Sequence, residues 1–253
     1  MNTFEFPQPV NGVYVLTAPK SDFEQVYLDV RSKEHRLPDD SFVALLPVVP
    51  KTHPHAHEWQ LRKRTADRFV TYLQQHPKGS ILEIGCGNGW FSHVVSNYAT
   101  AVTGLDVGIT ELELAARCFS LPHLKFVCCT DWSLLPEQCF DFIVFNASFQ
   151  YFVHDSAFWQ SLYRLLRPKG EIHILDSPFY LSDTRQEARK RSESYFLNMG
   201  IPEASSYYHH PLYTDLPAHA RILYAPKRWK RLLFQTDSPF KWIMVKKQSE
   251  HER

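Results

Sequence analysis

The sequence predicts an α/β protein built on a doubly wound, mostly parallel sheet. Short apolar segments alternate with segments of helical periodicity between residue 59 and about residue 180. The apolar segments contain few polar residues, which is typical of parallel strands that are covered on both faces. The first of them runs directly into a glycine-rich turn. Strands, short links and helices in this alternation produce right-handed crossover units and a doubly wound sheet.

The individual elements follow from periodicity and from start signals. A helix is predicted from Trp59, because apolar residues recur at four-residue spacing up to Leu73. Thr110 and Glu113 have the spacing of a capping box, so a helix is predicted to begin there. Asp155 is predicted to cap a later helix. Further helices are expected at 91–98 and 183–198, and strands are expected at 81–84, 101–105, 124–129, 140–145, 171–175 and 240–246.

The predicted organisation is one domain with two additions. Residues 1–58 are proline-rich and without clear period, so an irregular extension that covers the active site is expected. Residues 59–253 form the domain, with a seven-stranded sheet and a lid-like insertion at about 182–216. Within that insertion, residues 200–216 are rich in Tyr, His and Pro and are predicted to be a long loop. Long loops in compact domains are usually functional or disordered.

Composition restricts the class of protein. The chain of 253 residues is 44% hydrophobic and 22% charged, as in soluble globular domains, and its net charge of +1 gives no global attraction to nucleic acid or membranes. Five cysteines without a CxxC pair do not suggest a disulfide scaffold or a zinc ribbon. No signal peptide or spanning segment is apparent, so a cytoplasmic location is expected by elimination. The basic clusters at 62–64, 189–191 and 227–231 are interpreted as solvated helix faces.

The most informative segment is the turn that follows the first predicted strand. It reads E-I-G-C-G-N-G from Glu83 to Gly89 and leads directly into a helix. A dinucleotide-binding turn needs a third glycine where Trp90 stands, and no Walker pattern is present. Asp106 ends the second predicted strand, 21 residues after Gly85, where an acid can accept hydrogen bonds from ribose hydroxyls. A role for Asp106 as a turn residue or helix cap is the alternative.

These segments resemble class I S-adenosylmethionine-dependent methyltransferases of the broad "type 11" group. The resemblance rests on LEIGCGNGWFS at 82–92, VTGLDV at 102–107, FDFIVFNAS at 140–148 and LRPKGEI at 166–172, and it covers roughly residues 60–180. It implies a Rossmann-like fold with S-adenosylmethionine as cofactor. The implied cofactor-binding residues are Glu83, Gly85, Cys86, Gly87, Gly89, Asp106, Val107, Asp131, Trp132 and Asn146.

The resemblance also implies individual roles. Glu83 would hold the loop near the amino group of the cofactor, and the glycines would surround its methionine part. Asp131 and Trp132 would contact the adenine, and Asn146 would lie beside the transferred methyl group. Aromatic faces such as Tyr151 or Phe149 could stabilise the sulfonium cation, although simple core packing is the alternative for both.

The chemistry requires above all the alignment of a nucleophile with the methyl–sulfur bond, and a base only if the nucleophile is protonated. Three histidines are candidate bases: His154, His209 and His210. No metal site is predicted, because the alternate histidines at 53, 55 and 57 are a weak pattern. The expected acceptor is a small molecule or biosynthetic intermediate with an O- or N-nucleophile. The alternatives are an RNA or protein methyltransferase and a cofactor-binding protein without turnover.

Partner predictions are limited. A small-molecule substrate is expected, nucleic-acid and membrane partners are not, and the oligomeric state does not follow from the sequence. The segment N-A-S-F from Asn146 differs from the N-P-P-Y sequence of many methyltransferases that act on amino groups of bases. D-S-P-F-Y from Asp176 is superficially similar to it. Because it follows the fifth predicted strand rather than the fourth, it is interpreted as a turn.

Overall fold

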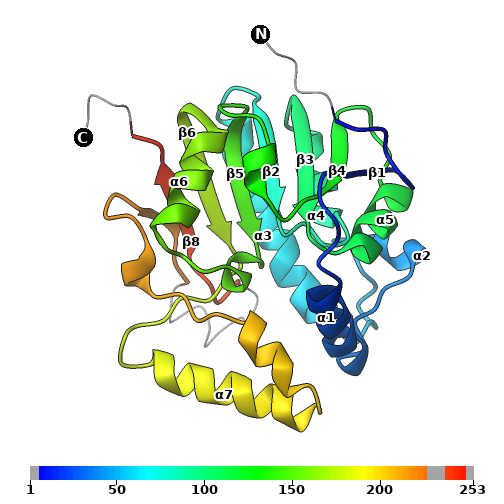
Figure 1. The fold of residues 1–253 in the computed structure, drawn as a ribbon, viewed down its shortest axis with the longest axis vertical. Helices are drawn as coiled ribbons and strands as arrows, with labels where there is room; N and C mark the ends of the chain where they lie inside the picture. Colours follow the sequence, from blue (N-terminus) through cyan, green and yellow to red (C-terminus); the bar gives the residue numbers. More distant parts are fainter. Residues whose placement is uncertain (1–5, 227–236, 249–253) are drawn as a thin grey trace.

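A single twisted sheet of eight strands forms the centre of the protein (Figure 1). The structure is a computed structural model and describes residues 6–226 and 237–248. The strand order is β1-β4-β3-β2-β5-β6-β8-β7. The first six strands in this order run parallel, and the last two form an antiparallel hairpin against β6. The strands are β1 (Val13–Val15), β2 (Ser80–Ile84), β3 (Ala101–Asp106), β4 (Leu124–Cys128), β5 (Phe140–Asn146), β6 (Leu166–Leu175), β7 (Arg221–Tyr224) and β8 (Trp242–Lys246).

Helices cover both faces of the sheet. Successive strand residues point to opposite faces, and in β2 Ile81 packs into one apolar core while Leu82 packs into another. The first core is closed by α3, α4 and α5, and the second by α6. The helices are α1 (Ser21–Lys33), α2 (Asp40–Val43), α3 (Ala56–Gln74), α4 (Trp90–Ser96), α5 (Ile109–Cys118), α6 (Ser156–Leu165) and α7 (Arg185–Asn198). The predicted doubly wound, mostly parallel α/β fold is therefore confirmed.

The N-terminal segment is not irregular, contrary to the prediction for residues 1–58. It contributes β1, which pairs parallel to β4 with Val13 opposite Phe126. The sheet has eight strands, whereas seven were predicted and six of those were given ranges. The backbone N–H of Leu16 continues this pairing to the carbonyl of Cys128 at 2.9 Å. Only three residues form the strand, which explains why no alternating pattern marks it.

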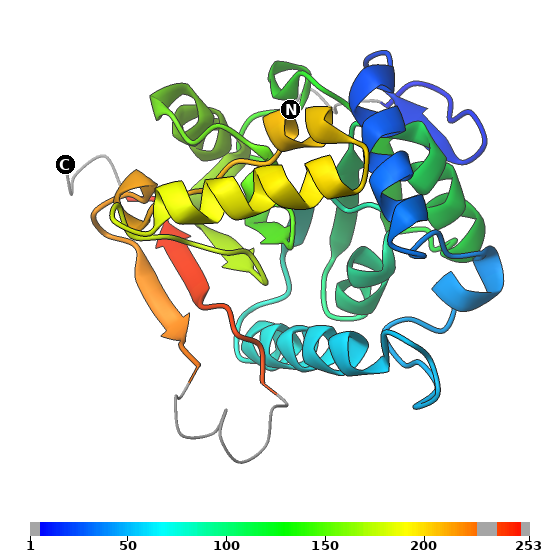
Figure 2. The same cartoon turned by 90° about the horizontal axis from the view of Figure 1, so that it is seen from below.

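Helix α1 follows β1 and lies beyond the carboxyl ends of the parallel strands, as does α7 (Figures 1 and 2). Val26 and Val30 of α1 pack against Phe196 of α7 and Ile201. The N-terminal addition and the insertion after β6 thus contact each other over the same edge of the sheet.

Two predicted helix starts have different outcomes. Asp155 caps α6, because its carboxylate accepts the backbone N–H of Phe158 at 2.8 Å. The prediction of a capping box at Thr110 is wrong, since α5 begins at Ile109 and no side chain at its N-cap forms a capping hydrogen bond. The N–H of Thr110 instead donates to Glu24 of α1 at 2.6 Å. A partner 86 residues away in sequence has replaced the local cap.

The insertion after β6 is only partly a loop. Residues 200–216, predicted as one long loop, contain two short 3-10 helices, η3 (Pro202–Tyr207) and η4 (Tyr213–Asp215). Two further 3-10 turns follow β4 and β5, namely η1 (Trp132–Leu134) and η2 (Phe149–Tyr151). The predicted final strand corresponds to β8, whereas β7 was not predicted. The basic cluster at 227–231 lies outside the described residues.

Candidate active site

The glycine-rich turn joins β2 to α4 in a conformation that only glycine adopts easily. Gly85, Gly87 and Gly89 all have left-handed backbones, with φ of +75°, +50° and +74°. A Cβ atom on Gly85 would lie 2.5 Å from the Cβ of Ser148. The N–H groups of Gly85 and Cys86 donate to the carbonyl of Leu105 at 2.8 and 3.1 Å, which ties the turn to the end of β3.

Asp106 stands at that strand end and binds the turn directly. Its Oδ2 accepts the N–H of Gly87 at 2.8 Å, and its Oδ1 accepts the N–H of Val107 at 2.7 Å and that of Gly108 at 3.2 Å. Burial raises the pKa of this carboxyl above its usual value. A carboxylate has about four lone-pair sites, and three are used here, so Asp106 can still accept a hydroxyl group of a ligand.

Two further carboxyl groups, the buried Glu83 and the half-buried Glu111, face the same turn. Burial raises the pKa of Glu83 to about 8, and its Oε2 accepts the Ser92 hydroxyl at 2.5 Å. Burial also raises the pKa of Glu111 to about 7, although Arg31 opposes the rise. A Cβ on Gly87 would lie 2.9 Å from Glu111 Oε2, so this carboxyl abuts the turn. Three acids around one turn form an environment that favours a cationic ligand.

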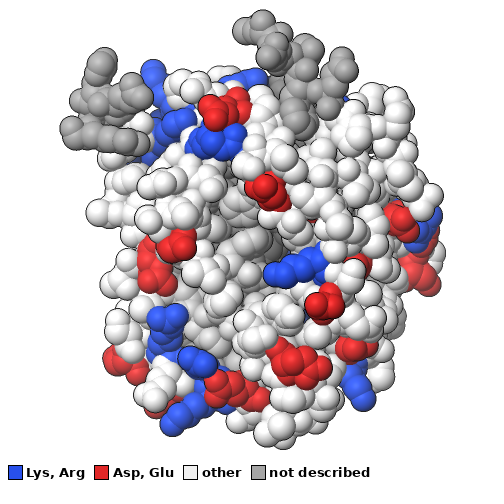
Figure 3. All heavy atoms as spheres, viewed as in Figure 1, with Lys and Arg blue, Asp and Glu red and all other residues white. Residues whose placement is uncertain are grey.

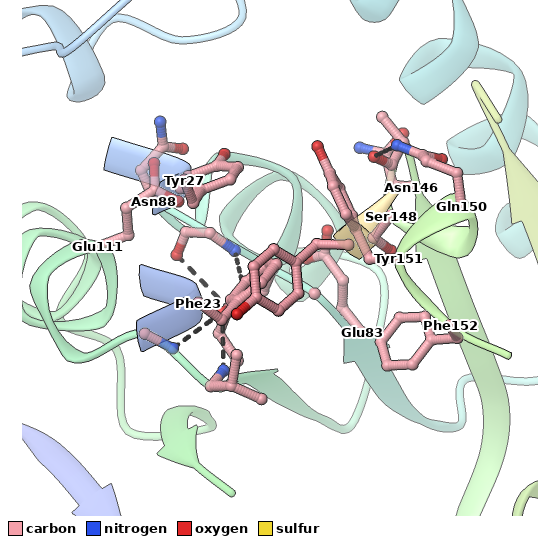
Figure 4. A pocket seen from close by; sticks show the side chains of 18 of the residues that line it. Phe23, Tyr27, Glu83, Asn88, Glu111, Asn146, Ser148, Gln150, Tyr151 and Phe152 are labelled. Atoms are coloured by element: carbon pink, nitrogen blue, oxygen red, sulfur yellow. Dashed lines mark hydrogen bonds between the residues drawn. The ribbon is translucent and has the colours of Figure 1, made fainter. Parts of the chain in front are cut away.

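A cavity of about 1230 Å³ opens at the carboxyl ends of the strands, where ligands of open α/β sheets bind. Figure 4 shows Glu83, Glu111 and Asn146 around it, together with aromatic side chains. Nine of the ten residues predicted to bind the cofactor line it: Glu83, Gly85, Cys86, Gly87, Asp106, Val107, Asp131, Trp132 and Asn146.

Gly89 is the predicted residue that does not line the cavity. It is the N-cap of α4, and a Cβ there would lie 2.5 Å from the ring of Phe126. This glycine therefore allows α4 to pack closely on the sheet. Asp131 lines the cavity, but it also caps η1 by accepting the N–H of Ser133 at 2.9 Å, and this hydrogen bonding lowers its pKa.

Aromatic side chains from three segments form a second wall. Phe23 of α1 contacts Tyr151 of η2 edge-on at 5.9 Å between ring centroids, and it contacts Tyr207 of η3 at 5.2 Å. Tyr27 lies 6.3 Å from Tyr151 in the same way. All four rings line the cavity. The face of the molecule above this region is hollowed near its centre (Figure 3).

Residues 82–174 match the model of the family described as "Methyltransferase domain" (Methyltransf_11). The chain carries a class I S-adenosylmethionine-dependent methyltransferase domain. The matched range extends from β2 to the end of β6 and contains the turn, Asp106 and Asn146. The predictions of the family and of its cofactor, S-adenosylmethionine, are confirmed. The three acids suit this cofactor, because it has a sulfonium and an ammonium group.

Individual relatives are more distant. The chain is 30% identical to a malonyl-[acyl-carrier protein] O-methyltransferase of Priestia megaterium over 37% of this chain and 35% of that protein. It is 28% identical to the enzyme of the same description from Serratia marcescens over 62% and 63% of the two chains. The chain thus spans about a third to two thirds of these relatives. The YcgJ protein from Bacillus subtilis shares the fold, with a TM-score of 0.52, 16% identity and coverage of 64% and 71%.

The three histidines predicted as bases are not brought together. His209 lines the cavity, and burial lowers its pKa. His154 does not line it: its ring stacks on Phe149 at 3.9 Å, and its Nε2 lies 2.9 Å from the Phe149 carbonyl. Burial lowers the pKa of His154 to about 4. His210 is also absent from the wall, since its Nε2 pairs with the Ser192 hydroxyl at 2.9 Å. The geometry gives no support for bases at His154 and His210.

The structure also gives different outcomes for the other aromatic and histidine candidates. Phe149 is fully buried in the core, so the packing alternative holds for it, whereas Tyr151 lines the cavity. Within the described parts of the chain, no group of three or more potential metal ligands occurs. His53 stacks instead on Phe42 at 4.5 Å.

The sequence analysis did not predict that residues of α1 line the site. Phe23, Tyr27 and Arg31 face the cavity from this helix. The signal was present, because Phe23, Val26, Tyr27 and Val30 have the i, i+3, i+4, i+7 spacing of an amphipathic helix. Burial outweighs the effect of the neighbouring Arg31 and raises the pKa of Tyr27 far above its usual value, which keeps the Tyr27 hydroxyl neutral.

Proposed function

We propose that this protein transfers the methyl group of S-adenosylmethionine to a small-molecule or biosynthetic-intermediate acceptor by direct in-line displacement. The observation that carries the proposal is the continuity of the cavity. Pockets for one drug-sized ligand are about 300–1000 Å³, and the 1230 Å³ here extends from Asp106 to Trp59, Arg62 and Phe240. Two ligands can therefore meet in one enclosure, with Asn146 between the two regions.

The cofactor supplies an activated methyl group on a cationic sulfur, and the residues of the chain orient the two reactants. Asp106 and the turn hold the nucleoside and methionine parts, and Glu83 faces the ammonium group. Tyr151 presents an aromatic ring to the region of the sulfonium. The covers formed by α1 and η3 exclude water and align the acceptor, which can contribute about 7–11 kcal/mol to the barrier reduction.

The charge distribution supports a small acceptor over RNA or protein. Several residues of the basic clusters within the described ranges pair with acids on their own helices: Lys63 with Asp67 at 2.7 Å, Arg62 with Glu58 at 2.8 Å and Arg189 with Glu193 at 2.9 Å. Lys, Arg, Asp and Glu are interspersed on the face in Figure 3. No helix in the described parts has the length and apolar character to cross a bilayer.

The proposal is tested by binding and by turnover. Titration calorimetry with S-adenosylhomocysteine should show a Kd of about 1 µM or lower, which corresponds to about 8 kcal/mol. Incubation with S-adenosylmethionine and a metabolite library should then release S-adenosylhomocysteine for one acceptor class. Tighter binding of NAD than of S-adenosylhomocysteine would refute the cofactor assignment. Nanomolar binding of RNA at physiological salt would favour the nucleic-acid alternative.

A further inference from the structure

Two cavity residues contain a buried oxygen atom without a hydrogen-bond partner. Among the described residues, buried unpartnered side-chain oxygens occur at Gln150 Oε1 and Asp176 Oδ2, and both residues line the cavity. An unsatisfied buried polar atom destabilises the folded state, and such atoms are rare in native proteins. A ligand that donates hydrogen bonds to these oxygens would remove that destabilisation.

Asp176 is held firmly by its other oxygen. Its Oδ1 accepts the Thr65 hydroxyl at 2.9 Å and the Ser238 hydroxyl at 2.7 Å. Burial raises the pKa of this carboxyl, while the guanidinium groups of Arg62 and Arg68 on α3 oppose the rise. The side chain is therefore fixed from α3 and from the segment before β8, and one oxygen remains unused.

The side-chain amide of Gln150 likewise has one atom in a hydrogen bond and one buried oxygen without a partner. Its Nε2 donates to the carbonyl of Ala147 at 2.7 Å, which identifies the opposite atom as the oxygen. Asn146 lies nearby and also lines the cavity (Figure 4). Its side chain can turn its own amide oxygen to the same space.

Asn146 and Asp176 come from neighbouring strand ends, and Gln150 lies in η2, which follows β5. Asn146 of β5 pairs in register with Leu175 of β6, and the N–H of Ala147 donates to the Leu175 carbonyl at 2.9 Å. Both strands leave the sheet through a left-handed residue that is not glycine, Ala147 with φ of +57° and Asp176 with φ of +44°. Backbone strain of this kind occurs preferentially at functional sites.

We propose that the methyl acceptor is an amine whose N–H groups donate hydrogen bonds to Asp176, Gln150 and Asn146. This inference rests on the proposed function and specifies its acceptor atom. The unused atoms are acceptors, so they need a donor with more than one hydrogen. An amino group has two or three, a hydroxyl has one, and an ionised carboxylate has none and would be repelled by an ionised Asp176.

An amine that binds as an ammonium first passes one proton to the Asp176 carboxylate and from there to solvent, and it then reacts as a neutral nucleophile. Its nitrogen lone pair forms a bond to the methyl carbon while the bond from that carbon to sulfur breaks, and the electron pair of the broken bond stays on sulfur. The nitrogen then carries the positive charge that the sulfur has lost. One N–H proton passes from this nitrogen to the Asp176 carboxylate and from there to solvent, which yields the neutral methylated amine.

Three matched probes distinguish the acceptor chemistries. The aromatic walls at Trp59 and Phe240 suit a phenyl group, so we would titrate 2-phenylethylamine, 2-phenylethanol and phenylacetate into protein saturated with S-adenosylhomocysteine. The expected result is at least tenfold tighter binding of the amine. An amine affinity no greater than that of the alcohol or the carboxylate overturns the proposal.

Two variants test whether Asp176 causes the preference for the amine. Asp176→Asn keeps the shape and should remove the tenfold preference for the amine without changing the affinity for S-adenosylhomocysteine. Thr65→Val removes only a hydroxyl bound to the other oxygen and should keep the preference. Retention of the preference in Asp176→Asn, or its equal loss in Thr65→Val, overturns the role of Asp176. Failure of S-adenosylhomocysteine to bind the wild type would instead refute the proposed function.

Discussion

The carboxylate of Glu24 accepts a hydrogen bond from the backbone N–H of Thr110 at 2.6 Å. Glu24 lies on α1, and Thr110 lies in the first turn of α5. A second contact joins the same segments, because the N–H of Lys20 donates to the carbonyl of Val107 at 3.0 Å. The N-terminal cover is thus bound directly to the loop that follows Asp106.

Replacing Glu24 by alanine should remove the cap of α5. Lost N-terminal caps cost about 0.5–2 kcal/mol, so the free energy of unfolding measured with urea should fall by that amount. Gln25→Ala is the matched control, since the side chain of Gln25 donates to Asp29 on the same helix at 3.0 Å. Equal effects of the two substitutions would show that the contact with α5 contributes nothing.

Glu83 should make the cofactor-free protein less stable as pH rises. Its pKa is about 8 in the folded protein, above the ordinary value of 4.5, so the folded state binds more protons than the unfolded state between these values. Stability therefore decreases as pH rises through this window. Urea unfolding at pH 5, 6, 7 and 8 should show a smaller decrease for Glu83→Gln than for the wild type. Parallel curves would mean that Glu83 does not titrate in this range.

Asp106→Ala should weaken binding of S-adenosylhomocysteine by about 1–3 kcal/mol, because the charge-assisted hydrogen bonding of this carboxylate to the ribose is lost. Asp106→Asn should lose less, since one oxygen remains to accept a hydroxyl. Calorimetry measures both affinities. Unchanged affinity in the alanine variant would remove Asp106 from the ribose site.

Gly85→Ala should abolish cofactor binding while the sheet stays folded. Its Cβ would meet Ser148 at 2.5 Å in a left-handed backbone. Gly200→Ala is a close control, because Gly200 has the same φ of +75° but no atom within 4 Å of the added Cβ. The control should show only the backbone cost of about 1–2 kcal/mol in stability. Normal cofactor affinity in Gly85→Ala would contradict the site.

His209→Ala should leave the affinity for S-adenosylhomocysteine nearly unchanged and lower kcat/KM for the acceptor at least tenfold, about 1.4 kcal/mol. The reason is that His209 lines the cavity beside Tyr207 and Tyr208. His210→Ala, at the next position but directed to Ser192, should keep wild-type kcat/KM. Full activity of His209→Ala would exclude this loop from the reaction.

The cofactor half of the site was predictable because its signals are local. The segment from Glu83 to Asp106 combines a strand, a tight turn, a helix start and a second strand end within a short stretch, and each part constrains the next. Asp155 was predictable for the same reason, since its partner Phe158 lies three residues away.

The rest depended on contacts between distant parts of the chain. The cap at Thr110 failed because Glu24 reaches the same N–H group from α1. His154 and His210 were candidates by residue type. In the structure His154 stacks on Phe149 and His210 pairs with the Ser192 hydroxyl, so neither side chain lines the cavity. Asp176 follows a strand like any turn residue, and its significance depends on Thr65 and Ser238, which lie far away in sequence.

The cavity is lined both by residues inside the family match and by residues outside it. The match to the methyltransferase family covers residues 82–174, while Trp59, Arg62, Tyr207 and Phe240 line the acceptor region from outside that range. The appended segments can consequently diverge, or be exchanged between related proteins, without altering the turn that holds the cofactor. A chimera carrying the first 62 residues and the insertion of another family member would therefore reshape the acceptor region around Asn146, Gln150 and Asp176 and retain the cofactor preference of this chain.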